Sequence, residues 1–177
     1  MREARYPFLK SAIPFAKELA EATQQTVHFS EFSGGLLSII HVEDSPRAHR
    51  VTVEIGTHLP FHATASGMAF LAFSSPQQIE AALSQPLESF TAHTVTPPES
   101  IRKMLAEITD RGFSINNQGL EAGVVSTGAA IRAPRGQSVA AIAIAAPLVR
   151  TNINTLNGFG AAVSDAAKRI SEKYYGS

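Results

Sequence analysis

The stretch LPFHATASGMAFLAF, residues 59–73, places a polar, small-residue segment between two apolar runs. Residues 59–61 are suited to the end of an extended segment and residues 68–73 to an apolar helix, so residues 64–67 are predicted to form the first turn of that helix. Thr64 is one of the residue types that cap helix N-termini through a side-chain oxygen. The stretch therefore predicts a helix that begins at the polar interruption and continues into the core.

The expected first turn carries only the small side chains of Ala65, Ser66 and Gly67. A helix N-terminus exposes unpaired N–H groups and the positive end of the helix dipole, and both attract anions. Small side chains leave room for a ligand to approach these backbone groups. Two interpretations stay open here: an anion-binding site, or a helix that simply packs closely on a sheet.

Other segments also have apolar residues at helical spacing. They are residues 8–22, with the stripe Phe8, Ala12, Phe15, Leu19 and Ala22; residues 76–83; residues 96–111, with Thr96 as N-cap, Glu99 three residues later and Gly112 as the stop; and residues 156–174. Pro14 is expected either to kink the first of these helices or to mark a later start. Helices are thus predicted in all parts of the chain.

Alternating or β-branched runs predict strands at residues 26–32, 36–42, 50–55, 124–131 and 138–146. Gly34 and Gly35 supply the positive φ angles of a tight hairpin turn, and residues 134–137 are typical of a second turn. Strands that come in hairpin-linked groups favour a mostly antiparallel sheet with helices on its faces. We expect one α/β (α+β) domain over residues 1–177.

Composition excludes several classes of protein. The 15 basic residues balance 15 acidic residues, whereas a DNA-binding domain needs clustered positive charge. The chain has no cysteine, which excludes disulfides, thiolate metal sites and a cysteine nucleophile. No window has the length and hydropathy of a membrane span or a signal peptide. A soluble, unprocessed, cytoplasmic protein without membrane contact is expected.

Histidines and acidic residues lie close together between residues 28 and 49, but their spacing along the predicted strands does not favour a metal site. His28 and Glu31 are three apart on a predicted strand, so they point to opposite faces. His41 and Glu43 share a face, but two ligands leave a zinc site incomplete. We expect solvated or edge-strand histidines and no metal.

A hydrolase needs a nucleophile, a base and an oxyanion hole. Ser66 and His62 are close in sequence, but no G-x-S-x-G elbow and no orienting acid accompany them. Ser66 is better interpreted as a helix-start residue and His62 as a packed or hydrogen-bonded loop histidine. No catalytic residue is assigned, although a small enzyme that uses this pair remains an alternative.

One predicted strand has a face of small side chains. In residues 139–145, Ala141, Ala143 and Ala145 share one face, and Ile142 and Ile144 share the other. Val124, Ser126 and Gly128 similarly form a small-residue face on the preceding strand. Such a surface either receives a close-packed helix or leaves volume for a ligand.

Several motifs in order along the chain resemble the effector-binding domain of IclR-type transcriptional regulators. They are GTHLPFHATASGMAFLAF (56–73), TVTPPESI (94–101), RGFSINNQGLEAGVVS (111–126) and AIAIAAPLVR (141–150), followed by a long final helix. The resemblance covers nearly the whole chain. It implies a GAF-like domain that binds a small organic acid, needs no cofactor and assembles into dimers or tetramers. Family members usually carry an N-terminal winged helix-turn-helix, which is missing here, so the chain is expected to be a truncated form or a stand-alone sensor that does not itself contact nucleic acid.

Carried over by position, the resemblance puts the ligand carboxylate over the backbone of Ala65, Ser66 and Gly67. The remaining expected ligand-binding residues are Leu59, Thr64, Met68, Asn116, Val124, Ser126, Ala143 and Ala145. Where many relatives have an acidic cluster, residues 116–119 read NNQG, and alanines 143 and 145 stand where some sensors of small acids have hydroxyls. A pocket with fewer hydroxyls predicts a carboxylate with an apolar or aromatic body. A purely structural oligomerisation module is the remaining alternative.

Overall fold

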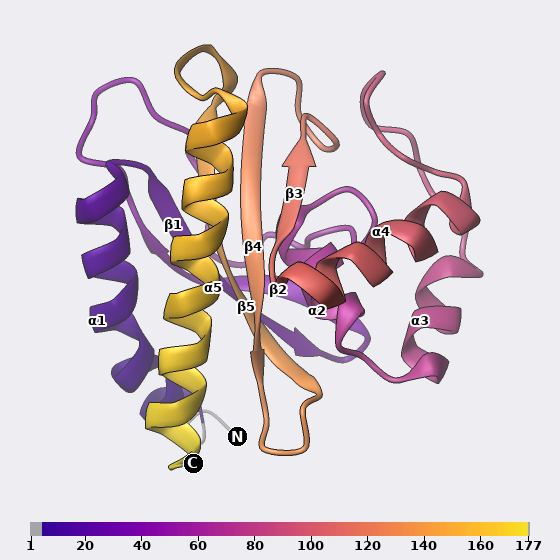
Figure 1. The fold of residues 1–177 in the computed structure, drawn as a ribbon, viewed down its shortest axis with the longest axis horizontal. Helices are drawn as coiled ribbons and strands as arrows, with labels where there is room; N and C mark the ends of the chain where they lie inside the picture. The colour runs from indigo at the N-terminus through magenta and orange to yellow at the C-terminus, as the bar shows by residue number, and fades with distance from the viewer. Residues whose placement is uncertain (1–4, 177) are drawn as a thin grey trace.

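The computed structural model describes residues 5–176 and is built on one antiparallel sheet (Figure 1). The sheet has five strands in the spatial order β2-β1-β5-β4-β3, and each neighbouring pair is antiparallel. The strands are β1 (Thr26–Ser33), β2 (Leu36–Glu43), β3 (Ser114–Asn117), β4 (Val124–Arg132) and β5 (Ser138–Pro147). The expected α+β class is confirmed.

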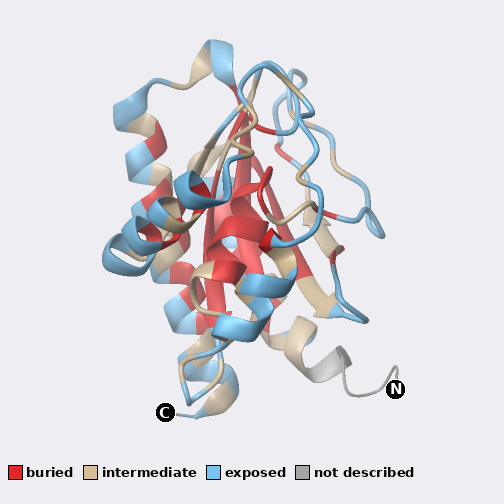
Figure 2. Ribbon diagram, turned by 90° about the vertical axis from the view of Figure 1, so that its right-hand side faces the viewer, coloured by how far each residue is buried: buried red, intermediate tan, exposed pale blue. Residues whose placement is uncertain are grey.

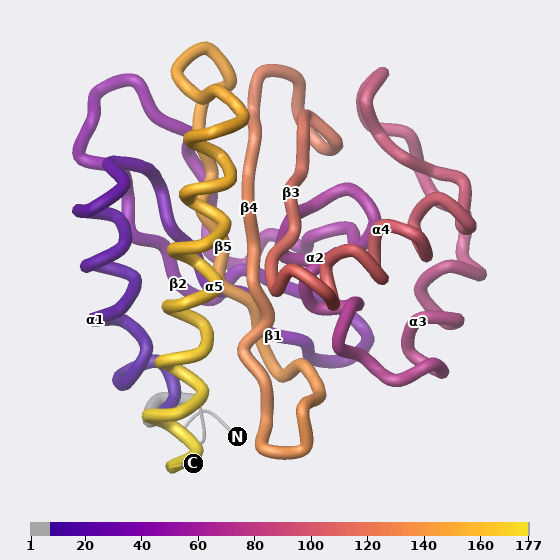
Figure 3. The backbone as a smooth tube through the Cα atoms, viewed as in Figure 1, coloured from indigo at the N-terminus to yellow at the C-terminus, as the bar shows by residue number. Residues whose placement is uncertain are grey.

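Helices cover both faces of this sheet. Helices α1 (Arg5–Thr23) and α5 (Ile153–Tyr175) lie side by side on one face, and α2 (Ala65–Ala72) lies against the other (Figure 1). Helices α3 (Pro76–Leu83) and α4 (Pro98–Arg111) lie further out on the α2 side, and a 3₁₀ turn (Leu148–Arg150) leads from β5 into α5. The tube in Figure 3 shows that α1 begins and α5 finishes at the same end of the molecule.

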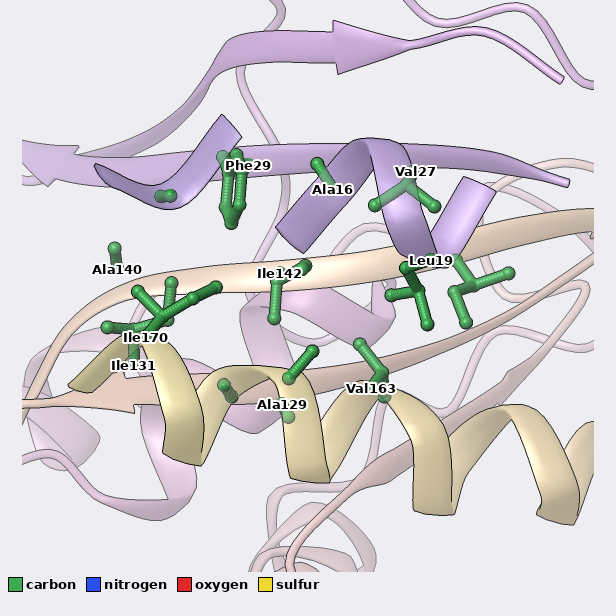
Figure 4. Packing of buried hydrophobic residues seen from close by; sticks show 14 of the residues in the cluster. Ala16, Leu19, Val27, Phe29, Ala129, Ile131, Ala140, Ile142, Val163 and Ile170 are labelled. Atoms are coloured by element: carbon green, nitrogen blue, oxygen red, sulfur yellow. The ribbon is translucent and has the colours of Figure 1, made fainter. Parts of the chain in front are cut away.

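The main apolar core lies between the sheet and the α1–α5 pair. Val27 and Phe29 from β1 pack there with Ile142 from β5 and Val163 from α5 (Figure 4). Ile144 of β5 belongs to the same cluster. In Figure 2 the buried residues concentrate on the central strands. Because side chains alternate along a strand, the residues between these large ones face α2 instead.

The hairpin between β1 and β2 forms as predicted. Gly34 and Gly35 have φ angles of 60° and 82°, the left-handed values that a two-residue turn of this hand requires. A bulge between Phe29 and Ser30 shifts the register of the pair. The turn from β4 to β5 at residues 134–137 and the short helix α3 also lie where the sequence predicted them.

The predicted strand at residues 50–55 is wrong. This segment is a loop outside the sheet that ends in a turn at Ile55; the Val51 carbonyl accepts a 2.7 Å hydrogen bond from Thr26 Oγ1, and Ile55 is 66% exposed. Val51, Thr52 and Val53 instead all line a cavity on the α2 side of the sheet, and the two valines are partly buried while Thr52 is exposed. The chain just after this segment joins β2 through an isolated bridge between Ser38 and His58 and through backbone hydrogen bonds of Gly56, Thr57 and Leu59 to Ile39 and Leu37.

Helix ends differ from the predictions in two places. The N-cap of α4 is Pro97, without a side-chain cap, and not Thr96; a residue that precedes proline is pushed out of helical geometry, and Pro97 precedes Pro98. Gly112 ends α4 at a φ of 90°, as expected. Helix α1 continues through Pro14, and Ala22 is exposed. The buried residues of α1 are Ala12, Ala16, Leu19 and Ala20.

Strand β3 was not predicted, since it has only four residues with polar asparagines at its end. Within residues 5–176, each helix is too short or too polar to cross a lipid bilayer.

Candidate functional site

The start of α2 leaves two backbone amides free. Thr64 is its N-cap with an extended backbone, and Thr64 Oγ1 accepts a 3.0 Å hydrogen bond from the Gly67 amide, as predicted. The Met68 amide donates to the Thr64 carbonyl at 3.1 Å. Within the described part of the chain, the amides of Ala65 and Ser66 have no acceptor. These two N–H groups lie at the positive end of the helix dipole.

Helix α2 is held tightly on the sheet. The Ser114 hydroxyl donates to the Ala65 carbonyl at 2.6 Å, and the Ser138 hydroxyl donates to the Phe70 carbonyl at 2.7 Å. At Gly128 in β4 an added Cβ would lie 2.8 Å from the Ala65 carbonyl oxygen, so only glycine allows this approach. The first turn of α2 is therefore held against β3 and β4, and the later part of the helix is held against β5.

A cavity of about 90 Å³ lies between this first turn and the sheet. It is lined by β1 (His28), β2 (Ile39), the extended loop (Val51, Thr52, Val53), the approach to α2 and its first turn (Leu59, Ala63, Thr64, Ala65, Ser66), β3 and the following loop (Asn116, Leu120, Glu121), β4 (Val124, Ser126) and β5 (Ala143, Ala145). The alanine face of β5 therefore leaves volume under the helix start.

The structure brings most of the predicted site residues together around this cavity. Leu59, Thr64, Ala65, Ser66, Asn116, Val124, Ser126, Ala143 and Ala145 all line it. Asn116 has a positioning role, because its Nδ2 donates to the Ala63 carbonyl at 2.8 Å and its Oδ1 accepts from the Gly119 amide at 2.9 Å. These bonds tie the β3 end to the chain that leads into α2.

Gly67 and Met68 do not line the cavity. An added Cβ at Gly67 would lie 2.5 Å from the Phe61 backbone, so the glycine serves close packing, and its amide is already bonded to Thr64. Met68 is buried in a separate apolar cluster between α2, α3 and α4, together with Leu71 and Ile101. The prediction placed both residues in the site because they follow the first turn in sequence, but the turn of the helix directs them elsewhere.

His28 is the cavity residue that the sequence reasoning missed. It is only 6% exposed, and β1 lies between β2 and β5, so the expectation of a solvated or edge-strand histidine is wrong for this residue. Burial lowers the pKa of His28 from 6.5 to about 4, so its ring is neutral at pH 7. The alternation of Thr26, His28 and Ser30 along β1 was the available signal, since all three polar residues are buried on one face.

Two side-chain atoms of the lining are buried without a hydrogen-bond partner among the described residues. They are His28 Nδ1 and the Ser66 hydroxyl oxygen, and Ser66 is 1% exposed. An unsatisfied buried polar group costs about 1–3 kcal/mol. A bound group that reached them would recover part of this cost.

A larger hollow of about 490 Å³ lies beside α2 and α3, and its chemistry is different. Apolar side chains such as Phe32, Leu36 and Phe70 dominate its lining. None of the buried unpartnered polar atoms within residues 5–176 belongs to a residue that lines it. The small cavity under α2 is therefore the better candidate for specific recognition of a polar ligand.

The hydrolase alternative fails on geometry. His62 lines the larger hollow and bonds through Nε2 to the Glu88 carbonyl at 2.8 Å, while Ser66 lines the small cavity. The Ser66 hydroxyl has no base bonded to it among the described residues. The described residues do not form a metal site either. His41 Nε2 lies 2.8 Å from Glu43 Oε1, but residues 5–176 contain no group of three or more histidine or acidic side chains that could hold a metal ion.

The fold is an α+β domain with a small cavity between the start of α2 and the sheet. Residues 4–172 match the sequence model of the family described as Bacterial transcriptional regulator IclR C-terminal. The chain belongs to this family, and the relatives that it matches are transcriptional regulators and repressors and not enzymes.

Individual relatives agree with this assignment. The chain is 30% identical over 166 residues to the transcriptional repressor IclR of Escherichia coli K12. The matched region covers 92% of this chain and 61% of that protein. The crystal structure of an IclR-type regulator from Silicibacter sp. TM1040 superposes with a TM-score of 0.93 at 34% identity, over 99% of this chain and 70% of that one. The chain thus spans about three fifths of the E. coli repressor.

A more distant structure carries a ligand. An IclR homolog from Microbacterium hydrocarbonoxydans, solved in complex with 4-hydroxybenzoate, superposes with a TM-score of 0.86 at 23% identity, over 97% of this chain and 70% of that one. At this level of identity the likeness concerns the fold alone.

Proposed function

We propose that this chain is the effector-sensing domain of an IclR-type regulator and that it binds a small organic carboxylate in the cavity under α2. The observation that carries the proposal is the convergence of free hydrogen-bonding groups at one small cavity. The amides of Ala65 and Ser66, the Ser66 hydroxyl and the ring of His28 all belong to its wall. The carboxylate would accept from the two amides at the helix N-terminus.

The size of the cavity supports a short acid. A cavity of about 150 Å³ is known to accept benzene, whereas this one measures about 90 Å³. A short oxo acid would therefore fit as the cavity stands, while an aromatic acid would require the loops that carry Val53 and Leu120 to move outward. The cavity size thus favours a short acid over the aromatic acid that the alanines of β5 suggested. The 4-hydroxybenzoate bound to the Microbacterium relative is an aromatic carboxylate, so an aromatic acid stays in the panel to be tested.

In the whole protein, we infer that the domain acts in the cytoplasm as part of a homo-oligomer, a dimer or a tetramer. A winged helix-turn-helix outside this chain would contact DNA. The effector would bind one arrangement of the oligomer better than another and so shift the population of DNA-binding states. No cofactor, metal or membrane enters this mechanism.

Thermal unfolding of the 177-residue chain with glyoxylate, pyruvate and 4-hydroxybenzoate tests the proposal. A ligand at about 100 times its dissociation constant should stabilise the fold by about 2.7 kcal/mol. Pyruvamide, which lacks the carboxylate, should give no shift. Replacing Ser66→Ala should weaken binding by about tenfold, because the hydroxyl adds one bond while the amides remain. If no acid shifts the unfolding temperature, the sensor proposal fails and a structural oligomerisation module is favoured.

A further inference from the structure

His28 is an unusual component for a cavity that is proposed to hold an anion. Its neighbours across the sheet are Val42 on β2 and Ala143 on β5, and neither can bond to an imidazole ring. The ring makes no hydrogen bond to any residue within 5–176, and its Nδ1 is buried. The side chain is therefore placed in the wall of the cavity without a structural partner.

The cavity offers little fixed charge to balance a carboxylate. From β2 and the extended loop it receives Ile39, Val51, Thr52 and Val53; from the start of α2, Thr64, Ala65 and Ser66; from β4 and β5, Val124, Ser126, Ala143 and Ala145. None of these titrates. Besides His28, the titratable residue of the lining is Glu121, an exposed carboxylate on the loop before β4. No lysine or arginine belongs to the lining.

A buried anion without a countercharge is costly, and two backbone amides supply only partial charge. The group in the wall that can become positive is the imidazole of His28. We propose that a carboxylate effector binds together with one proton, which His28 takes up from the solvent, so that the bound state is an ion pair of imidazolium and carboxylate. This inference rests on the proposed function.

The His28 ring is expected to be neutral when the cavity is empty and charged when the cavity holds a carboxylate. In the empty cavity, burial holds the pKa of His28 at about 4, so the ring is neutral. A carboxylate in the cavity favours the charged ring and raises that pKa. Binding should consequently be tightest in mild acid and weaken as the pH rises, by up to tenfold per pH unit where a full proton is taken up.

Isothermal titration calorimetry of the 177-residue chain with pyruvate, or with the acid of the panel that gives the largest thermal shift, measures this linkage. Titrations at one pH in buffers of different ionisation enthalpy give the number of protons exchanged. We expect an uptake between zero and one proton per site, largest near pH 5 and decreasing toward pH 8. Histidine-labelled NMR should show one buried ring changing from neutral to charged when the acid is added.

His28→Asn is the decisive variant, because asparagine keeps hydrogen-bonding capacity without a titrating ring. It should bind with no proton uptake and with an affinity that is constant from pH 5 to pH 8. His49→Asn is the matched control, because His49 is exposed and lies outside the cavity lining, and it should leave the uptake unchanged. If His28→Asn does not fold, the NMR titration of the unmodified chain decides the question alone.

The outcomes separate the two proposals. Binding whose heat is the same in every buffer, a histidine ring that stays neutral in the complex, or uptake that persists in His28→Asn would overturn the role of His28 while leaving carboxylate sensing intact. No binding of any acid at any pH would overturn both.

Discussion

The two faces of the sheet are made by the same strands but do different things. On the face toward α1 and α5, β5 contributes Ile142 and Ile144, which are fully buried in a dry core. On the face toward α2, the alternate residues of β5 are Ala143 and Ala145, and a cavity remains. The alternation of large and small side chains along one strand therefore gives a packed apolar core on one face and leaves a cavity on the other.

The largest effect is expected from a truncation on the dry face. Ile142→Ala removes buried methyl groups that α5 cannot move in to replace, and such changes cost about 2–5 kcal/mol. Denaturation with urea should show this loss in the free energy of unfolding. Affinity for the effector, measured at a temperature where the variant is folded, should stay within a factor of about three. A large loss of affinity at full folding would show that the two faces are coupled.

Low pH should reduce the stability of the fold through His28, on the cavity face of the sheet. The pKa of His28 is about 4 in the folded chain, below its ordinary value of 6.5, so the unfolded chain binds a proton first as the pH falls. Stability is then complete above pH 6.5 and is lost as the pH falls toward 4, by about 3 kcal/mol from this group. Urea denaturation at several pH values should show the slope, and His28→Asn should flatten it. An equal slope in both proteins would assign acid sensitivity to other groups.

Adding one methyl group to a glycine should destabilise the chain where the glycine is closely packed and not where it faces free space. Gly128→Ala places a Cβ 2.8 Å from the Ala65 carbonyl, so the first turn of α2 must shift; we expect a loss of about 1–3 kcal/mol and of effector binding. Gly158→Ala is the matched control, since its Cβ meets nothing within 4 Å and it lies inside α5. That change should stabilise the chain by about 0.5–1 kcal/mol. Thermal unfolding distinguishes the two, and a tolerated Gly128→Ala would contradict the fixed position of α2.

The smallest change in stability is expected where a side chain fills the cavity. Ala143→Val adds two methyl groups to open volume and should alter the free energy of unfolding by less than about 1 kcal/mol while it abolishes binding. Ala146→Val, on the same strand but packed against Val125 and Leu156, should cost about 1–3 kcal/mol and leave binding intact. Paired denaturation and titration of the two variants give the result; similar behaviour of both would remove the distinction between the faces.

Local sequence predicted those parts of the fold and site whose signals are short in range. The Thr64 cap, the position of α2 and the two faces of β5 all follow from residue type and spacing. For His28 the alternation of polar residues along β1 was the one local signal, and it could not show burial by itself, because β1 becomes an inner strand only through its pairing with β5, far along the chain. Val51 and Val53 alternate like a strand although they face the cavity from a loop. Gly67 was assigned to the ligand because a pattern cannot show that the Phe61 backbone already occupies the space beside it.

The order of strands in the sheet also has a consequence for how the protein is made. β1 pairs on one side with β2, which follows at once, and on the other with β5, near the end of the chain, where Val27 lies opposite Ile144. During synthesis the β1–β2 hairpin exists long before its partner strand, so one edge of β1 stays unpaired. Unpaired edges invite pairing with other chains, and distant pairings form slowly. Chains that terminate before β5, which begins at Ser138, should therefore aggregate more readily than the full chain.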